Sequence, residues 1–170
     1  MISRMRCGAP ALAALLLSGC ASLGGLASLQ APTFEVAPGQ QAELRLMGPS
    51  AQHPLGGAAV RLYARVGNPN PVGLTLATLR GQLALDGAHA ADVDFPLGLP
   101  LRAGEDAVVP LDVMIGFANL PGLANVVTAA VSRGTVGYNL NGTVGVDAGL
   151  LGRPTFGPMT LLQGNLQARR

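Results

Sequence analysis

A strand that runs directly into two prolines is the feature that most constrains how this chain folds. Residues 58–66 read AAVRLYARV, and their apolar side chains fall on alternate positions, which is the spacing of a strand with one buried face. The next turn reads Asn68-Pro69-Asn70-Pro71. Each proline fixes its own φ, lacks an N–H and disfavours the helical region for the asparagine before it. A helix therefore cannot cross this corner.

Two interpretations of the corner stay open. It is either an ordinary β-turn that contains two prolines, or a rigid corner in which the side chains of Asn68 and Asn70 hydrogen-bond to nearby backbone groups. In both cases an apolar, strand-like rhythm resumes over residues 74–85. We expect the corner to be structural and not a binding site.

Short alternating segments recur along the chain, and Gly, Pro and Asp-Gly turn signals separate them. This pattern predicts a mainly β fold, an antiparallel β-sandwich of the fibronectin III or immunoglobulin-like kind with about seven or eight strands. The predicted strands are Thr33–Val36, Gln41–Met47, Ala58–Val66, Leu74–Leu85, Val93–Leu101, Ala107–Ile115, Thr135–Asp147 and Met159–Gln167.

One segment has helical spacing instead. Apolar residues at positions 123, 126, 127, 130 and 131 repeat as on one face of a helix. Asn119 is a suitable cap, Pro121 suits a first helical turn, and Gly134 directly follows the basic Arg133. We therefore predict one α-helix that packs over an open end or edge of the sandwich.

The first residues have the pattern of a bacterial lipoprotein signal. Two arginines precede an apolar stretch, residues 9–17, which is too short to cross a bilayer as a helix. Residues 17–20 read LSGC, and this order resembles a lipobox, in which small residues let a peptidase cleave before a lipid-carrying Cys20. The alternative is a plain secretory signal with an incidental cysteine.

These features divide the chain into a signal peptide at residues 1–19, a tether at 20–31 and one domain at 32–168. The second cysteine, Cys7, lies in the signal, so we expect no disulfide in the mature chain. Two or three acyl chains on Cys20 anchor a protein stably to a membrane. We expect a cell-envelope location, facing the periplasm from the outer membrane in a two-membrane bacterium.

The charge balance excludes several functions. Of the eleven basic residues, all of them arginines, Arg4 and Arg6 lie in the signal, and the nine that remain equal the nine acidic residues. A mature chain without basic surplus has no electrostatic footprint for nucleic acid. Because the chain has no lysine, Schiff-base, P-loop and Ser-Lys chemistry are excluded.

Residues able to support catalysis or metal binding are few. His53 and His89 lie among small or turn-forming residues and outside any recognisable catalytic motif. Asp92 and Asp94 share one face of a strand and, with Asp86, could in principle bind a hard cation, but no calcium-loop pattern surrounds them and we interpret them as a solvated strand face. We expect no enzyme activity, no cofactor, no metal and no small-molecule substrate.

The glycines of residues 137–149 lack the spacing of a nucleotide-binding loop. We interpret them as bulges, bends or close contacts between strands.

The wider pattern resembles a known family. The strand that ends in Asn68-Pro69-Asn70-Pro71, the following GLTLATLRGQLALDG and the run LPLRAGEDAVVPLDVMI at 99–115 are similar to the water stress and hypersensitive response (WHy) domain of the group 2 late-embryogenesis-abundant, desiccation-related proteins. The resemblance extends over about residues 32–167.

The resemblance implies a non-enzymatic protein that limits damage or aggregation of other proteins during drying, freezing or oxidation. Its partners would be client proteins, bound weakly and without specificity, and the membrane that holds the lipid on Cys20. The alternative from another class is a structural or assembly lipoprotein of the envelope that binds one specific partner through a sheet edge.

Overall fold

The computed structural model describes residues 29–51, 53–119 and 121–169. The predicted signal peptide, Cys20 and most of the predicted tether therefore lie outside the described residues. Within the described ranges, no helix is both long and apolar enough to span a membrane.

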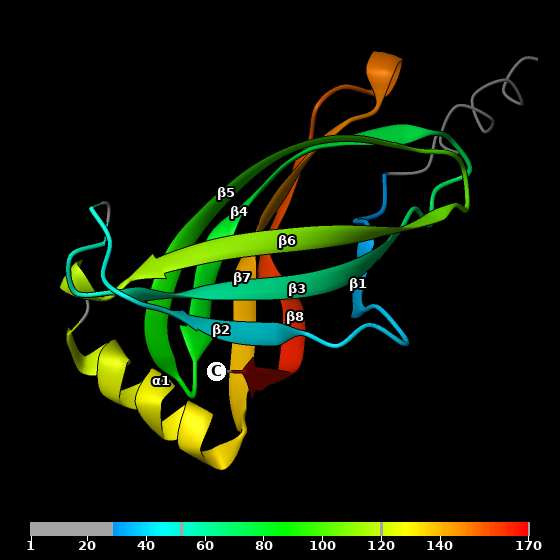
Figure 1. Cartoon of the computed structure of the whole chain (residues 1–170). Helices are drawn as coiled ribbons and strands as arrows, with labels where there is room; N and C mark the ends of the chain where they lie inside the picture. The colour runs from blue at the N-terminus through cyan, green and yellow to red at the C-terminus, as the bar shows by residue number, and fades with distance from the viewer. Residues whose placement is uncertain (1–28, 52, 120, 170) are drawn as a thin grey trace, which may run out of the picture.

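The described chain folds into eight strands and one α-helix (Figure 1). The helix α1 (Pro121–Arg133) follows a short 3-10 turn, η1 (Phe117–Asn119), and a second such turn, η2 (Gly149–Leu151), joins the last two strands. The strands are β1 (Thr33–Val36), β2 (Glu43–Met47), β3 (Gly57–Gly67), β4 (Leu74–Leu85), β5 (Ala88–Leu101), β6 (Asp106–Gly116), β7 (Thr135–Asp147) and β8 (Thr155–Arg169).

The strands form one mixed sheet that does not close. β3 pairs antiparallel with β6 along its whole length on one side, and with β1 and β2 on the other. β2 also pairs with β8, in parallel, and β8, β7, β4 and β5 continue the sheet as antiparallel neighbours. In Figure 1, β6, β3 and β2 pass in front of β5, β4, β7 and β8. The short β2–β8 pairing thus links the front strands to those behind.

The mainly β class with one helix is confirmed, whereas the β-sandwich and its immunoglobulin-like or fibronectin III-like type stay predictions. The expectation of purely antiparallel strands is wrong at one place, because β2 and β8 run parallel over Glu43–Arg45 and residues 167–169. β5 and β8 also begin earlier than predicted, at Ala88 and Thr155. The first residues of β5 pair with β4 and those of β8 pair with β7. This pairing keeps them in the sheet, although their own sequence gives little indication of a strand.

The core lies on the inner faces of the strands, as the alternation predicted. Val60, Leu62, Ala64 and Val66 of β3 are each at most 1% exposed. Burying a valine or leucine side chain stabilises a fold by about 1.5–3 kcal/mol relative to leaving it exposed. The largest buried side chains elsewhere in the sheet include Leu44, Leu76, Leu79, Leu83, Leu85, Leu111, Ile115, Leu140, Leu161 and Leu166.

A pair of facing glycines lets β4 and β7 approach closely. Gly81 and Gly142 are cross-strand partners. A Cβ at Gly81 would lie 2.1 Å from the carbonyl oxygen of Asn141, and one at Gly142 would lie 2.2 Å from that of Arg80. Because neither distance is possible for a real side chain, only glycine fits at either position. Gly142 therefore fits the interpretation of the β7 glycines as close strand contacts.

The helix has the predicted extent and covers one end of the sheet (Figure 1). Leu123, Val127 and Ala130 are buried and contribute to the core. The helix ends at Gly134, whose φ of 81° is left-handed and whose N–H donates to the carbonyl of Ala130 at 2.8 Å, as in a glycine-terminated helix. The side chain of Asn119, the predicted cap, lies outside what the structure describes.

Candidate functional site

The Asn68–Pro71 corner contains the two buried polar side chains of the described core. The Asn68 side chain is 2% exposed, and its Nδ2 donates to the carbonyls of Val72 at 2.8 Å and Arg102 at 2.9 Å. Its Oδ1 accepts hydrogen bonds from both the backbone N and the side-chain Nδ2 of Asn70, each at 3.0 Å. One amide therefore satisfies groups on the β3–β4 and β5–β6 connections at once.

The backbone of Asn68 joins the same two connections. Its N–H donates to the carbonyl of Glu105 at 2.9 Å, and its carbonyl accepts from the N–H of Gly104 at 3.1 Å. These two bonds extend the β3–β6 pairing beyond the ends of the strands, so that the corner and the β5–β6 turn hold each other in place.

The Asn70 side chain, 4% exposed, reaches the beginning of the described chain. Its Nδ2 donates to the carbonyl of Gln30 at 3.0 Å, and its Oδ1 accepts from the N–H of Gln30 at 2.8 Å. The corner consequently fixes the segment that leads from the predicted tether into β1.

The polar groups of both asparagine side chains are occupied by protein partners, and both side chains are buried. An amide in this state has no group to offer a ligand, so the corner acts as a junction of three segments. We predicted hydrogen bonds to nearby backbone groups, but not the partners Gln30 and Arg102. They lie 40 and 34 residues away in sequence, and no local pattern indicates them.

The two histidines are not brought together. His53 lies in the β2–β3 loop, where its backbone N–H donates to Ser50 Oγ and its carbonyl accepts from Ser50 N and Gly56 N. His89 lies in β5, with Nε2 3.9 Å from Asp92 Oδ1, and both side chains are exposed to solvent. In the described contacts Ser50 Oγ meets only the backbone of His53, and neither imidazole is hydrogen-bonded to a hydroxyl or a thiol, so these contacts contain no base and nucleophile pair.

The three aspartates considered as cation ligands are engaged separately. Asp94 Oδ2 accepts from Arg80 Nε at 3.0 Å, and Asp92 faces the exposed Gln82 across the β4–β5 pair. Asp86 lies in the β4–β5 turn and accepts hydrogen bonds from Arg133 and Gly137 instead. Among the residues that the structure describes, no group of three or more His, Cys, Asp or Glu side chains is placed to hold a metal ion.

Asp86 connects its turn to β7 and to the helix. Its Oδ1 accepts from the N–H of Gly137 at 2.9 Å, and its Oδ2 pairs with the guanidinium of Arg133 at the end of α1. The hydrogen bond from Gly137, and then the Arg133 charge, lower the pKa of the Asp86 carboxyl below its ordinary value. From the sequence we could predict only that Asp86 lies in a turn. Its hydrogen-bond partners could not be predicted, because they lie about 50 residues away along the chain.

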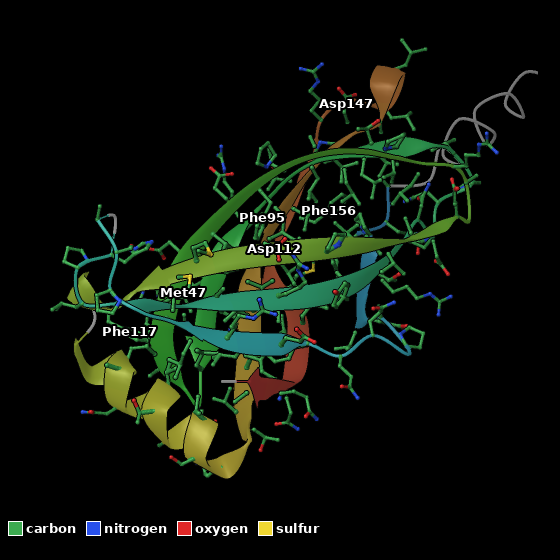
Figure 2. All side chains as sticks on the ribbon, viewed as in Figure 1. Met47, Phe95, Asp112, Phe117, Asp147 and Phe156 are labelled. Atoms are coloured by element: carbon green, nitrogen blue, oxygen red, sulfur yellow. The ribbon has the colours of Figure 1, made fainter. Side chains whose placement is uncertain are left out.

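A second aspartate has the same arrangement at the opposite end of β7. Asp147 Oδ1 accepts from the N–H of Gly149 at 2.9 Å, and its Oδ2 accepts from Arg153 Nε at 2.8 Å. The Gly149 hydrogen bond and the Arg153 charge lower the pKa of Asp147. Figure 2 shows Asp147 close to the turn that projects from the sheet.

Two of the hollows on the surface differ in how their polar groups are satisfied. One, of about 340 Å³, lies on the outer face of β2, β3 and β6, where Arg61 donates to both carboxylate oxygens of Asp112. Another, of about 350 Å³, lies beside Asn139 and the buried Tyr138, and neither the Tyr138 hydroxyl nor Asn139 Oδ1 has a hydrogen-bond partner. Burial raises the pKa of Tyr138, so this phenol is neutral and no general base.

Comparison with known proteins gives one family and a related fold. The profile of the family described as "Late embryogenesis abundant protein" matches residues 63–160, more than half of the chain. A solution structure of an Arabidopsis thaliana protein matches with a TM-score of 0.60 at 14% identity, covering 86% of this chain and 88% of that one. A crystal structure of an Archaeoglobus fulgidus protein matches with a TM-score of 0.41 at 10% identity, covering 84% and 99%. No curated protein sequence matches.

The family match begins within β3 and ends within β8. It therefore includes the Asn68–Pro71 corner and the run at 99–115 on which the resemblance was based. The Arabidopsis structure, at its low identity, shows that the fold is shared.

Proposed function

Because the chain belongs to the late embryogenesis abundant protein family, we propose that it is a non-enzymatic stress protein that limits damage or aggregation of other proteins during desiccation, freezing or oxidative stress. The family match over residues 63–160 carries this proposal. In the form proposed here, a WHy-type β-sandwich is held at the bacterial cell envelope by lipid on Cys20. It contacts its client proteins weakly and without specificity.

The outer face of β4, β7 and β8 supports such contacts. Gln82 lies opposite Asn141, Asn141 Oδ1 accepts from Thr160 Oγ1 at 2.8 Å, and Gln163 and Asn165 continue the row along β8. All five side chains are exposed. Neutral amides and hydroxyls both donate and accept hydrogen bonds. They are therefore suited to replace water at a client surface without binding it tightly.

The exposed charges are largely neutralised within the domain. Arg61 pairs with Asp112, Arg65 with Asp106 and Arg80 with Asp94, each across neighbouring strands. Exposed pairs of this kind add little stability, but they leave no large field of one sign to attract a charged partner. This supports weak, unselective contacts.

The strands at the ends of the sheet argue against the alternative of partner binding through a sheet edge. β1, β5 and β6 each pair with one neighbour in the sheet, and β1 has only four residues, which is too short to template much pairing. β5 contains Pro96 and Pro100, and β6 contains Pro110. Proline within a strand is tolerated at an edge and cannot donate to an added strand. These prolines also oppose edge-to-edge association of the protein with itself when water is lost.

Recovery of an unrelated enzyme after drying tests the proposed function. The full chain should preserve more activity than an equal mass of inert protein. Replacing His53 and His89 with Gln and Asp92 and Asp94 with Asn should leave the recovery nearly unchanged, because no reactive group is involved. A variant that stays folded by circular dichroism but no longer protects would reveal a specific site. No recovery above the inert control, together with one protein retained in a pull-down, would favour the assembly role.

A further inference from the structure

The β7–β8 turn presents two leucines to solvent. Leu150 is 106% exposed and Leu151 is 45% exposed, and Leu55 is the one other leucine of the described residues that is exposed. Burying a leucine is worth about 1.5–3 kcal/mol, so a pair held in water at the tip of a turn is an unused source of binding energy.

Hydrogen bonds hold the tip in one shape. Asp147 Oδ1 accepts from Gly149 N at 2.9 Å, and Ala148 N donates to the carbonyl of Gly152 at 2.9 Å. Gly149 and Gly152 have φ values of 61° and 93°, which favour glycine. The turn thus presents its leucines outward on a defined support.

The tip lies at the end of the domain where the chain enters from the tether. Asp147, the last residue of β7, is near the start of β4, since Thr75 is its cross-strand partner. β4 follows the corner whose Asn70 binds Gln30. In Figure 1 the tip, in orange, projects at the same end as the first described residues, in blue.

The tether limits how far this end can lie from a lipid on Cys20. Gln30 lies ten residue steps along the chain from Cys20. Such a segment spans at most about 33–36 Å when fully extended, and about 17 Å on average if it is flexible. The end of the domain that carries the tip is therefore the end held near the bilayer.

We propose that Leu150 and Leu151 insert into the lipid surface to which the chain is anchored, so that the domain meets the membrane at two points. This inference rests on the proposed lipid anchor at Cys20. The arginine nearest the tip, Arg153, pairs with Asp147, so the contact is apolar and should change little with ionic strength. The orientation would keep α1, at the other end of the sheet, away from the bilayer.

Leu55 provides a matched control. It is 67% exposed and lies in the β2–β3 loop, two residues before Gly57, whose cross-strand partner Gly116 ends β6. The whole length of β3 separates it from the corner, about 35 Å at 3.2–3.4 Å per residue.

The test places a polarity-sensitive thiol probe on the full chain, in a Cys7→Ser background, at Leu150→Cys or Leu55→Cys. In isolated membranes we expect blue-shifted emission and protection from a water-soluble quencher at position 150 only. Leu150→Ser with Leu151→Ser should weaken vesicle binding of the chain lacking lipid at least about tenfold, and Leu55→Ser should not. Equal emission at the two positions in membranes would overturn the proposal.

Mass spectrometry of Cys20 separates failure of the anchor from failure of the tip. If Cys20 is unmodified, the same probes are read on the chain carrying Cys20→Ser, mixed with vesicles of phosphatidylethanolamine and phosphatidylglycerol. A shift at position 150 alone then supports the tip contact without the anchor, and no shift refutes it. A concentration-dependent shift without vesicles would assign the tip to a second copy of the chain and also refute it.

Discussion

The side-chain amide of Asn70 pairs with the backbone of Gln30 as a neighbouring strand would, donating to its carbonyl at 3.0 Å and accepting from its N–H at 2.8 Å. Two prolines flank Asn70 and lack backbone donors of their own. A side chain therefore supplies the pairing that the backbone of this corner does not.

Loss of either asparagine amide should destabilise the domain. Asn68→Ala leaves the carbonyls of Val72 and Arg102 and the buried N–H of Asn70 without this partner, so we expect a loss of about 2–3 kcal/mol in the free energy of unfolding. Asn70→Ala should cost about 1–2 kcal/mol. Denaturant titration of each variant measures both values.

Two controls accompany this prediction. Asn165→Ala, at an exposed position of β8, should change stability by no more than about 0.5 kcal/mol. Gln30→Pro removes the backbone N–H that donates to Asn70 Oδ1, whereas Gln30→Ala keeps this N–H. The proline variant should therefore be the less stable of the two. Equal stability would show that the hydrogen bond between Gln30 and Asn70 contributes nothing.

Gly142→Ala should disrupt the sheet. Its Cβ would meet the carbonyl oxygen of Arg80 at 2.2 Å, and strands cannot separate there without losing hydrogen bonds, so we expect a loss of at least about 3 kcal/mol or failure to fold. Gly48→Ala, which meets no atom within 4 Å, is the control. Thermal unfolding followed by circular dichroism compares them, and similar melting temperatures would contradict the close contact.

A charge on β6 should be tolerated on one face and not on the other. Val113 is 5% exposed and Val108 is 53% exposed. Val113→Asp places an unpaired carboxylate in the core, which costs several kcal/mol, and should unfold the domain and abolish protection with it. Val108→Asp should retain the β spectrum and the cooperative transition. Loss of structure in both variants would show that the fold does not tolerate the charge on either face.

Stability should fall in acid through Asp86 and Asp147. Both carboxyls have a pKa below the ordinary value in the folded chain. Their contribution is therefore complete above about pH 4 and is lost as the pH falls through the lower, folded pKa. Asp86→Asn and Asp147→Asn should each be less stable at pH 7 and lose less stability between pH 4 and 2. Denaturant titrations at several pH values in this range measure the free energy of unfolding of each variant. If that free energy falls as steeply with pH as in the unchanged chain, the prediction is wrong.

Alternation made the strands predictable, because a side-chain period of two is a local property. The bounds of β4 and β7 agree with the prediction to the residue, and so does the end of the helix at Arg133 with Gly134 following it. The junctions were not predictable in this way. The Asn70–Gln30 pair, the Asp86–Arg133 contact and the parallel β2–β8 pairing all depend on segments that meet only after the chain has folded.

The β2–β8 pairing also bears on the order of folding. Glu43 pairs with Gln167 near the very end of the described chain, so this contact forms only when almost the whole sequence is present. Until then β2 and β7 each expose a strand edge that β8 later covers, and contacts between such distant residues form slowly. A chain released before β8, or cleaved within it, should therefore be prone to aggregation through the uncovered edges of β2 and β7.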